Sequence, residues 1–341
     1  MSKAWLPSAS INTLKQRAQI LATIRQFFDQ RNVLEVETPS LSRATITDPY
    51  LNALATKHTE PGASTSNILY LQTSPEYAMK RLLSAGSGDI FQLCKSFRDD
   101  EVGAHHNPEF TMLEWYRLGF SMQDLIDEVG QLLVKVLPIS KVEQFTYCEL
   151  FEHYCNFSPL TASIESILIC CEKVGLVGYM ASIEQQLKQQ NPSKALQAEQ
   201  LSLLKDSALQ VLFNQEIEPH IGKEIPAVVS HFPASQASLA TLAEDGLSAH
   251  RFEVYFKGLE LANGFNELQD ATTQKNRFLA DNEKRKTLGL PEKEIDAHFI
   301  AALEAGLPAC SGVALGVDRL IMLALNKQNI KDVLSFNYDN C

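Results

Sequence analysis

The chain of 341 residues lacks the features that mark several common classes of protein. It contains no run of more than three lysine or arginine residues, and its formal net charge is −11. Broad electrostatic binding of nucleic acid is therefore not expected, because such binding depends on clustered positive charge. A membrane-spanning helix needs about 18 consecutive apolar residues, and the sequence contains no such stretch. The opening MSKAWLPSASINTLKQR has no apolar signal-peptide core. We expect a soluble, cytoplasmic protein without membrane association.

Cysteine is present but lacks the spacing of a structural framework. The chain has seven cysteines, an odd number, and none of them forms a C-x-x-C pair. This predicts reduced thiols, with neither a disulfide framework nor a zinc site. A hydrophobic content of 45% is normal for a globular protein. We expect residues 1–341 to form a single large domain.

The most informative stretch is GDIFQLCKSFRDDEVGAHHNPEFTMLEWYRL, from Gly88 to Leu118. Ile90 to Arg98 alternates apolar with polar residues, and Phe110 to Tyr116 is rich in aromatic residues at a spacing of two. Both patterns predict strands. The polar segment Asp99 to Pro108 between them, with a glycine and a proline, predicts a loop.

Side chains of equal parity share one face of a regular strand. Arg98 then leaves the end of the first strand, while Phe110, Glu114 and Tyr116 line one face of the second. A guanidinium, an aromatic ring, a carboxylate and a phenol on one surface suit a flat, anionic ligand that carries an amine. The alternative is an ordinary hairpin in which the arginine pairs with an aspartate of the loop.

Other segments give simpler predictions. Apolar residues at helical spacing predict a helix over Ser10 to Gln30 with Ser10 as N-cap. The following segments are expected to be a strand from Val33 to Thr38, a loop or irregular hairpin from Asp48 to Asn67, a strand from Ile68 to Gln72, a helix from Met122 to Val136, a mostly helical insertion over about 156–215 with a break at Asn191-Pro192, and a strand from Pro226 to Phe232.

A second hairpin is predicted in RFEVYFKGLELANGFNEL, with a two-residue turn at Lys257-Gly258. Such a turn pairs Tyr255 with Glu260 and Glu253 with Ala262. Glu253 and Glu260 then become diagonal neighbours on one face, about 7–8 Å apart. Two carboxylates at that separation can share a divalent cation such as Mg²⁺. The alternative is two exposed glutamates.

The continuation of this hairpin needs an irregularity. Asn263, Phe265 and Glu267 have the opposite parity to Glu260, so they share its face only if a bulge lies near Asn263-Gly264.

A third stretch, PACSGVALGVDR, ends at Arg319. Gly312 and Gly316 would let the backbone approach a ligand closely. Arg319 is expected in the first turn of a helix that begins at Val317.

These stretches carry a family resemblance. FRDDEVGAHHNPEFTMLEWY resembles the second signature motif of the class II aminoacyl-tRNA synthetases in its lysyl version, VLEVETPSL resembles the first motif, and GVALGVDR resembles the third. ELANGFNEL resembles a lysyl-synthetase segment. The resemblance implies an α+β fold, with a mixed, mostly antiparallel sheet flanked by helices. It also implies a homodimer through Ile11–Pro39, although an amphipathic helix packed only on its own sheet remains the alternative.

The resemblance also implies roles for individual residues in amino-acid activation by ATP. The catalytic residues would be Arg98 and Arg319. The ATP-binding residues would be Arg98, Asp100, His106, Asn107, Phe110, Glu260, Leu261, Gly316 and Arg319. The amino-acid site would consist of Ser74, Glu76, Arg98, Glu114, Tyr116, Asn263, Glu267 and Ala314. Mg²⁺ would bind to Glu253 and Glu260. From the sequence alone, the better explanation of Glu76 is that it stabilises the start of a helix.

The chain also departs from the lysyl synthetases. Only about ten residues precede the resemblance, so no anticodon-binding domain is expected, and stable tRNA binding is not expected either. Ser74 and Ala314 stand where alanine and glycine are usual, and Asp100 is shorter than the usual glutamate.

These departures resemble the stand-alone lysyl-synthetase paralogues, which ligate lysine, preferably (R)-β-lysine, onto a lysine of translation elongation factor P. A truncated synthetase that charges tRNA and a non-catalytic regulatory paralogue are the alternatives.

Overall fold

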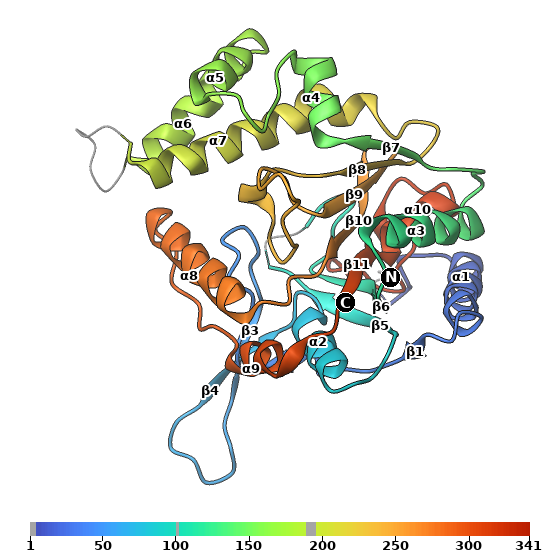
Figure 1. The fold of residues 1–341 in the computed structure, drawn as a ribbon. Coiled ribbons are helices and arrows are strands. Elements are labelled where there is room, and N and C mark those ends of the chain that lie inside the picture. The colour runs from blue at the N-terminus through green and yellow to red at the C-terminus, as the bar shows by residue number, and fades with distance from the viewer. Residues whose placement is uncertain (1–4, 100–101, 189–195) are drawn as a thin grey trace. The chain divides into compact units, whose positions relative to one another are not determined.

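The computed structural model describes residues 5–99, 102–188 and 196–341. The chain forms two compact units (Figure 1). The first unit comprises Met1–Lys141, Gln269–Lys275 and Lys293–Cys341, and the second comprises Val142–Leu268 and Asn276–Glu292.

The first unit begins with helix α1 (Ile11–Asp29). Its N-cap is Ser10, as predicted, and the Ser10 Oγ accepts a hydrogen bond of 3.1 Å from the Thr13 N–H. The apolar stripe of the helix buries Phe28 completely, and the Phe28 ring stacks on Phe91 with centroids 4.5 Å apart.

Four strands of the first unit lie in the order β1 (Leu34–Glu35), β5 (Ile90–Phe97), β6 (Glu109–Leu118) and β11 (Cys310–Gly316). Only β1 and β5 are parallel, and the other neighbours are antiparallel. β1 is shorter than the predicted strand from Val33 to Thr38, since its pairing ends after Val36, whose N–H donates to the Phe91 carbonyl at 2.9 Å.

A smaller sheet of the first unit contains β2 (Leu41–Ser42), β4 (Asn67–Leu71) and β3 (Ala55–His58), in that order. β3 and β4 form an antiparallel hairpin, which confirms the hairpin alternative for this region. The remaining helices are α2 (Glu76–Ser84), α3 (Met122–Val136), α9 (Ala297–Gly306) and α10 (Val317–Ala324), with a short 3₁₀ turn at Ile330–Asp332. Helices α2 and α9 pack together through Tyr77 and Phe299, whose rings stack at 4.5 Å (Figure 1).

The second unit has four strands in the order β10 (Leu259–Asn266), β9 (Arg251–Phe256), β8 (Ala227–Ser230) and β7 (Glu143–Thr146). The first two pairs are antiparallel, and β7 pairs with β8 in parallel. Its helices are α4 (Tyr147–Cys155), α5 (Ile164–Lys173), α6 (Val177–Leu187) and α7 (Ala198–Leu212), followed by a π-helical turn over Phe213–Ile217 and 3₁₀ turns at Glu218–His220 and Ala234–Gln236. Helix α8 (Ala271–Thr287) contributes residues to both units.

Helices α5, α6 and α7 account for the helical insertion expected over 156–215, and Figure 1 shows them side by side. The predicted break at Asn191-Pro192 lies outside the described residues. The core of this unit is aromatic: the rings of Tyr147 and Phe213 stack at 5.4 Å, and both are buried.

The combination of helices with mostly antiparallel strands confirms the α+β prediction. All seven cysteines are described and free. Within the described ranges, no helix combines the length and the apolar character needed to cross a membrane.

Candidate active site

The predicted hairpin of the first unit is present, with β5 and β6 in regular antiparallel register. Phe110, Met112, Glu114 and Tyr116 alternate on one face of β6. The β11 residues opposite the last three are all small: Gly316 faces Met112, Ala314 faces Glu114 and Gly312 faces Tyr116. Side chains of this size leave room above β11 beside the polar groups of β6.

Arg98 follows the last residue of β5, as predicted, and its N–H donates to the Pro108 carbonyl at 2.9 Å. Its guanidinium carbon lies 5.1 Å from the centroid of the Phe110 ring. A cation beside an aromatic face at this distance is a favourable pair. The structure therefore brings together the guanidinium and the aromatic ring that the sequence predicted to share a surface.

A cluster of carboxyl and hydroxyl groups lies farther along the same face. Tyr116 donates its hydroxyl hydrogen to Glu114 Oε1 at 2.6 Å, and Ser74 donates to Glu114 Oε2 at 2.8 Å. Ser74 Oγ in turn accepts from the N–H of Glu76 at 3.0 Å. We call Ser74, Glu76, Glu114 and Tyr116 the amine cup.

Glu114 is only 2% exposed. Burial, followed by the charge of Glu76, raises the pKa of Glu114 from 4.5 to about 8. The hydrogen bonds from Tyr116 and Ser74 and the charge of Lys80 act in the opposite direction. The Glu114 carboxyl is therefore protonated at neutral pH when nothing else is bound to the cup.

The sequence reasoning missed Lys80, which we add to the amine cup as its fifth residue. Its ammonium is 2.6 Å from Glu76 Oε1, one helical turn away on α2, and the residue is 1% exposed. Lysine is almost never buried so completely unless it is paired. The spacing of Glu76 and Lys80, four residues apart in a helix, was readable from the sequence.

Arg319 lies in the first turn of α10, as predicted. Its Nη2 is in hydrogen-bonding contact with the His106 ring, and its Nε donates to the His105 carbonyl at 3.3 Å. Gly316 is the N-cap residue of the same helix. The motif around Arg319 therefore meets the loop between β5 and β6.

Asp318, the neighbour of that arginine, was also missed. It is 2% exposed, and its Oδ2 accepts from the N–H of Thr111 on β6 at 2.7 Å. Its Oδ1 lies 2.6 Å from the guanidinium of Arg17 on α1. One buried carboxylate thus ties α10 to both β6 and α1.

The side chain of Asn107 forms hydrogen bonds with main-chain groups in this structure. Its amide donates to the Glu109 carbonyl at 2.7 Å and its Oδ1 accepts from the Tyr338 N–H at 2.9 Å. These contacts hold the loop in place. Asp100, a predicted nucleotide ligand, lies outside the described residues.

The second unit contains the other predicted hairpin. Lys257 and Gly258 have φ angles of 51° and 71°, both in the left-handed region of a type I′ turn. Tyr255 pairs with Glu260, as predicted, so Glu253 and Glu260 are diagonal neighbours on one face.

The bulge, however, is not where it was predicted. The register shifts between Glu260 and Ala262, so Leu261 is the extra residue. Glu253 consequently pairs with Asn263, and its predicted pairing with Ala262 is wrong. The shift brings Asn263 onto the face of Glu260 and Glu253. The bulge predicted near Asn263-Gly264 would have had the same effect.

The polar groups of this hairpin differ in exposure. Glu253 is 7% exposed and accepts hydrogen bonds from Arg251 and from the Tyr255 hydroxyl, whereas Glu260 is exposed. Asn263 Oδ1 is buried and accepts no hydrogen bond from the described residues. Glu267 is 2% exposed and bridges to Ala240 through the backbone.

The donor set of this face fits a hard cation. A carboxylate offers about four lone-pair positions, so the two hydrogen bonds to Glu253 leave capacity for a metal. Glu260 is accessible and Asn263 presents an amide oxygen. In the described part of the chain, no group of three or more His, Cys, Asp or Glu residues has a metal-binding arrangement, so an ion here would need further ligands from outside the protein.

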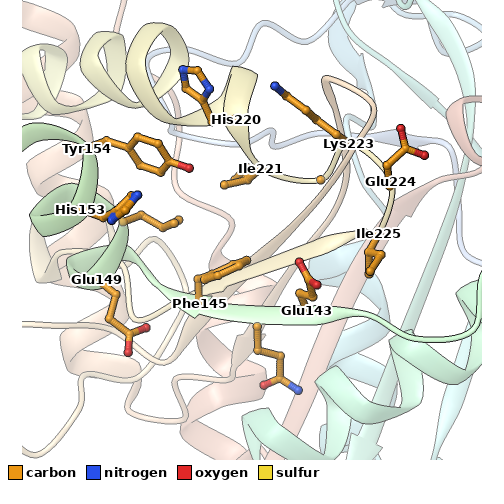
Figure 2. A pocket seen from close by; sticks show the side chains of 13 residues that line it. Glu143, Phe145, Glu149, His153, Tyr154, His220, Ile221, Lys223, Glu224 and Ile225 are labelled. Atoms are coloured by element: carbon orange, nitrogen blue, oxygen red, sulfur yellow. The ribbon is translucent and has the colours of Figure 1, made fainter.

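A cavity of about 710 Å³ in the second unit is lined by none of these residues. Figure 2 shows Tyr154 and His153 projecting from α4, Phe145 from β7, and Lys223 from the segment opposite. The lining contains both acidic and basic side chains, so its charge favours neither an anionic nor a cationic ligand.

Comparison with known proteins identifies the class. The family model for class II tRNA synthetases (D, K and N) matches residues 5–340, nearly the whole chain. The fold and the order of the three motifs are those of this class.

Curated relatives narrow the assignment. The chain is 50% identical over 339 residues to the elongation factor P–(R)-beta-lysine ligase of Erwinia tasmaniensis, covering 99% of this chain and 98% of the relative. It is 51% identical over 335 residues to the protein of the same name from Pseudoalteromonas translucida, covering 98% and 97%. The chain belongs to this ligase family within the class II tRNA synthetases, and it is therefore an enzyme.

Proposed function

We propose that this protein uses ATP to activate (R)-β-lysine, or lysine, and transfers it to a lysine of translation elongation factor P. In the first step, a substrate carboxylate oxygen attacks the α-phosphorus of ATP and pyrophosphate leaves. In the second step, the acceptor ε-amine attacks the carbonyl carbon of the adenylate. An amide forms, AMP leaves and the amine loses a proton. The names of the relatives support elongation factor P as the acceptor.

The observation that carries the proposal is the amine cup on the same strand face as the Arg98 and Phe110 pair. A buried carboxyl bonded by two hydroxyls suits a primary ammonium, because such a group would compensate its charge. Glu76 already pairs with Lys80, so a ligand with a neutral side chain would leave Glu114 as the carboxyl of the cup without a cation. A diamino acid therefore fits better than a neutral amino acid.

In the ATP site, Arg98 would contact the α-phosphate and the substrate carboxylate, using its planar fork for bidentate binding. Phe110 would stack on adenine. Arg319, in contact with His106, would neutralise the outer phosphates. No covalent intermediate with the enzyme is needed, because positioning and charge neutralisation can drive this chemistry. Asn107 would act mainly by holding the loop, given its two main-chain contacts.

In the amino-acid site, Ala314 lies opposite Glu114 in the register. Its methyl group and the Ser74 hydroxyl differ from the lysyl pattern and would favour an amine placed differently from that of α-lysine. Asn263 and Glu267, in the second unit, are further proposed contacts of the substrate amines. Leu261 is the bulge residue that sets the orientation of Asn263.

Mg²⁺ is the proposed metal, with Glu253 and Glu260 as carboxylate ligands. The orphan Asn263 Oδ1 on the same face supports an ion at this hairpin. When bound, the ion would supply charge neutralisation to phosphate oxygens. Within the protein, the hydrogen bonds from Arg251 and Tyr255 would fix the orientation of the Glu253 carboxylate.

The proposal includes a homodimer through Ile11–Pro39. Two large apolar side chains of this region are unusually exposed, Ile11 at 61% and Leu34 at 54%, as expected of a surface that a partner covers. A net charge of −11 supports a protein acceptor over stable tRNA binding. A cytoplasmic location follows from the proposed acceptor, a translation factor.

Exchange of pyrophosphate into ATP tests the first step. We expect exchange that depends on (R)-β-lysine or lysine and is abolished in Arg98→Ala. Arg43→Ala, at a side chain that is 82% exposed, is the matched control and should behave like the wild type. Near-normal exchange in Arg98→Ala would overturn the assignment of this residue. Because the family model is that of tRNA synthetases, lysyl-tRNA formation should be assayed in parallel, and efficient charging would favour a truncated synthetase.

A further inference from the structure

The buried ammonium of Lys80 changes the charge of the amine cup. Lys80 Nζ is 2.6 Å from Glu76 Oε1 and 5.8 Å from the centroid of the Phe299 ring on α9. Phe299 is held against α2 by its stack on Tyr77, with the two ring planes only 3° apart. The ammonium is thus enclosed between a carboxylate and an aromatic face, at 1% exposure.

The cup therefore already contains one cation from the protein itself. Because the Glu76 carboxyl is paired with Lys80, the second carboxyl, Glu114, decides the net charge of the cup. A protonated Glu114 makes the group of three neutral, and an ionised Glu114 leaves one negative charge. An incoming ammonium finds no uncompensated carboxylate until Glu114 gives up its proton.

We propose that Lys80 is a positioning residue that occupies Glu76 and so makes Glu114 the carboxyl that binds the substrate ammonium, with release of one proton. The inference rests on the proposed function, because it concerns the diamino substrate of that reaction. The step is an exchange in which the Glu114 O–H loses its proton to solvent and the carboxylate accepts hydrogen bonds from the charged amine. One ammonium enters and one proton leaves, so the charge of the cup is conserved.

The other groups that face Glu114 are compatible with this exchange. Tyr116 lies on β6 itself, Glu76 and Lys80 lie on α2, and Cys94 comes from β5. Burial, followed by the charge of Glu114, raises the pKa of Cys94 to about 11, so this thiol stays neutral. The facing position on β11 is Ala314, which carries no charge. Glu114 itself, whose pKa burial and the charge of Glu76 raise to about 8, can therefore exchange a proton near neutral pH.

The test is calorimetric titration of the full-length protein with (R)-β-lysine at pH 7 in two buffers with different enthalpies of ionisation. The difference in heat gives the number of protons released. Because the pKa of Glu114 is about 8, the wild type should release close to one proton per ligand at pH 7, and the number should fall toward zero at pH 9. Binding at pH 7 without proton release would overturn the inference.

Lys80→Met isolates the role of the ammonium. Without Lys80 the substrate ammonium can pair with Glu76, so proton release should drop close to zero and the pH dependence of the dissociation constant should flatten. An unchanged proton count in this variant would contradict the inference. If Lys80→Met does not fold, the wild-type titration still decides.

Lys188→Met is the matched control. Lys188 pairs with Glu184 at the same distance of 2.6 Å and the same spacing of four residues, but at 33% exposure and as the C-cap of another helix, α6. The number of protons that Lys188→Met releases on binding the ligand should equal that of the wild type. If no diamino acid binds and none supports pyrophosphate exchange, the proposed function fails. If binding and exchange are normal but protons are not released, only the role of Lys80 fails.

Discussion

Glu114→Gln should change how the stability of the protein depends on pH. The wild-type carboxyl is 2% exposed, and its two oxygens accept hydrogen bonds from Tyr116 and Ser74. Glutamine has the same shape and stays neutral at every pH. Its carbonyl oxygen can keep one of these bonds, and its NH₂ can donate to the other hydroxyl.

The sign of the effect follows from the pKa of Glu114, which is 4.5 as a reference and about 8 in the folded protein. Between these values the folded state holds a proton that the unfolded state has lost. The free energy of unfolding therefore falls as pH rises through this window, and the contribution is complete below pH 4.5. Each pH unit contributes about 1.4 kcal/mol, so the whole window amounts to about 5 kcal/mol.

Urea unfolding between pH 5.5 and 8, followed by tryptophan fluorescence, measures this slope. Both tryptophans, Trp5 and Trp115, belong to the first unit, so the signal reports on the part that contains Glu114. Glu114→Gln should be less pH-dependent than the wild type by about 1.4 kcal/mol per pH unit. Glu35→Gln, at a side chain that is 39% exposed, is the control and should keep the wild-type slope. Equal slopes for Glu114→Gln and the wild type would refute the reasoning.

Three further changes test other parts of the structure. Asp318→Ala should lower the free energy of unfolding by about 3–5 kcal/mol, because it removes a buried carboxylate and leaves the half-buried Arg17 without its charge partner; a urea midpoint equal to that of the wild type would contradict this. Gly222→Ala should cost about 1–3 kcal/mol in the same assay, because a Cβ would lie 2.5 Å from the Tyr255 carbonyl oxygen, whereas Gly86→Ala meets no atom within 4 Å and should cost less. Glu260→Gln should raise the Mg²⁺ concentration needed for pyrophosphate exchange with little effect on unfolding, since the side chain is exposed; an unchanged requirement would argue against its role as a ligand.

Much of the local structure was predictable, because it depends on short-range patterns. The N-cap at Ser10, the limits of α3 and the type I′ turn at Lys257-Gly258 each follow from a few neighbouring residues. The placement of Arg98 beside Phe110 also follows from strand parity. These features needed only the periodicity of a helix or strand and the residues that stop it.

The remaining features depend on contacts between distant segments. Leu261 is apolar and fits the alternation of β10, so nothing in the local pattern identifies it as the bulge. Asp318 binds Thr111 and Arg17, which lie about 200 and 300 residues earlier in the chain. Lys80 could have been noticed by its spacing from Glu76, but its burial against α9 could not be read from the sequence.

The central claim is that the activated diamino acid is transferred to a protein. Intact-mass spectrometry of elongation factor P, after incubation with this protein and ATP, tests it most directly. Parallel reactions would contain (R)-β-lysine, α-lysine or neither, with Arg98→Ala as the inactive enzyme and tRNA charging measured separately. The account predicts a mass increase of one lysyl group on the factor, larger with the β isomer, absent with Arg98→Ala, and not accompanied by charged tRNA. An unmodified factor in a reaction where pyrophosphate exchange is active would contradict the claim about the acceptor.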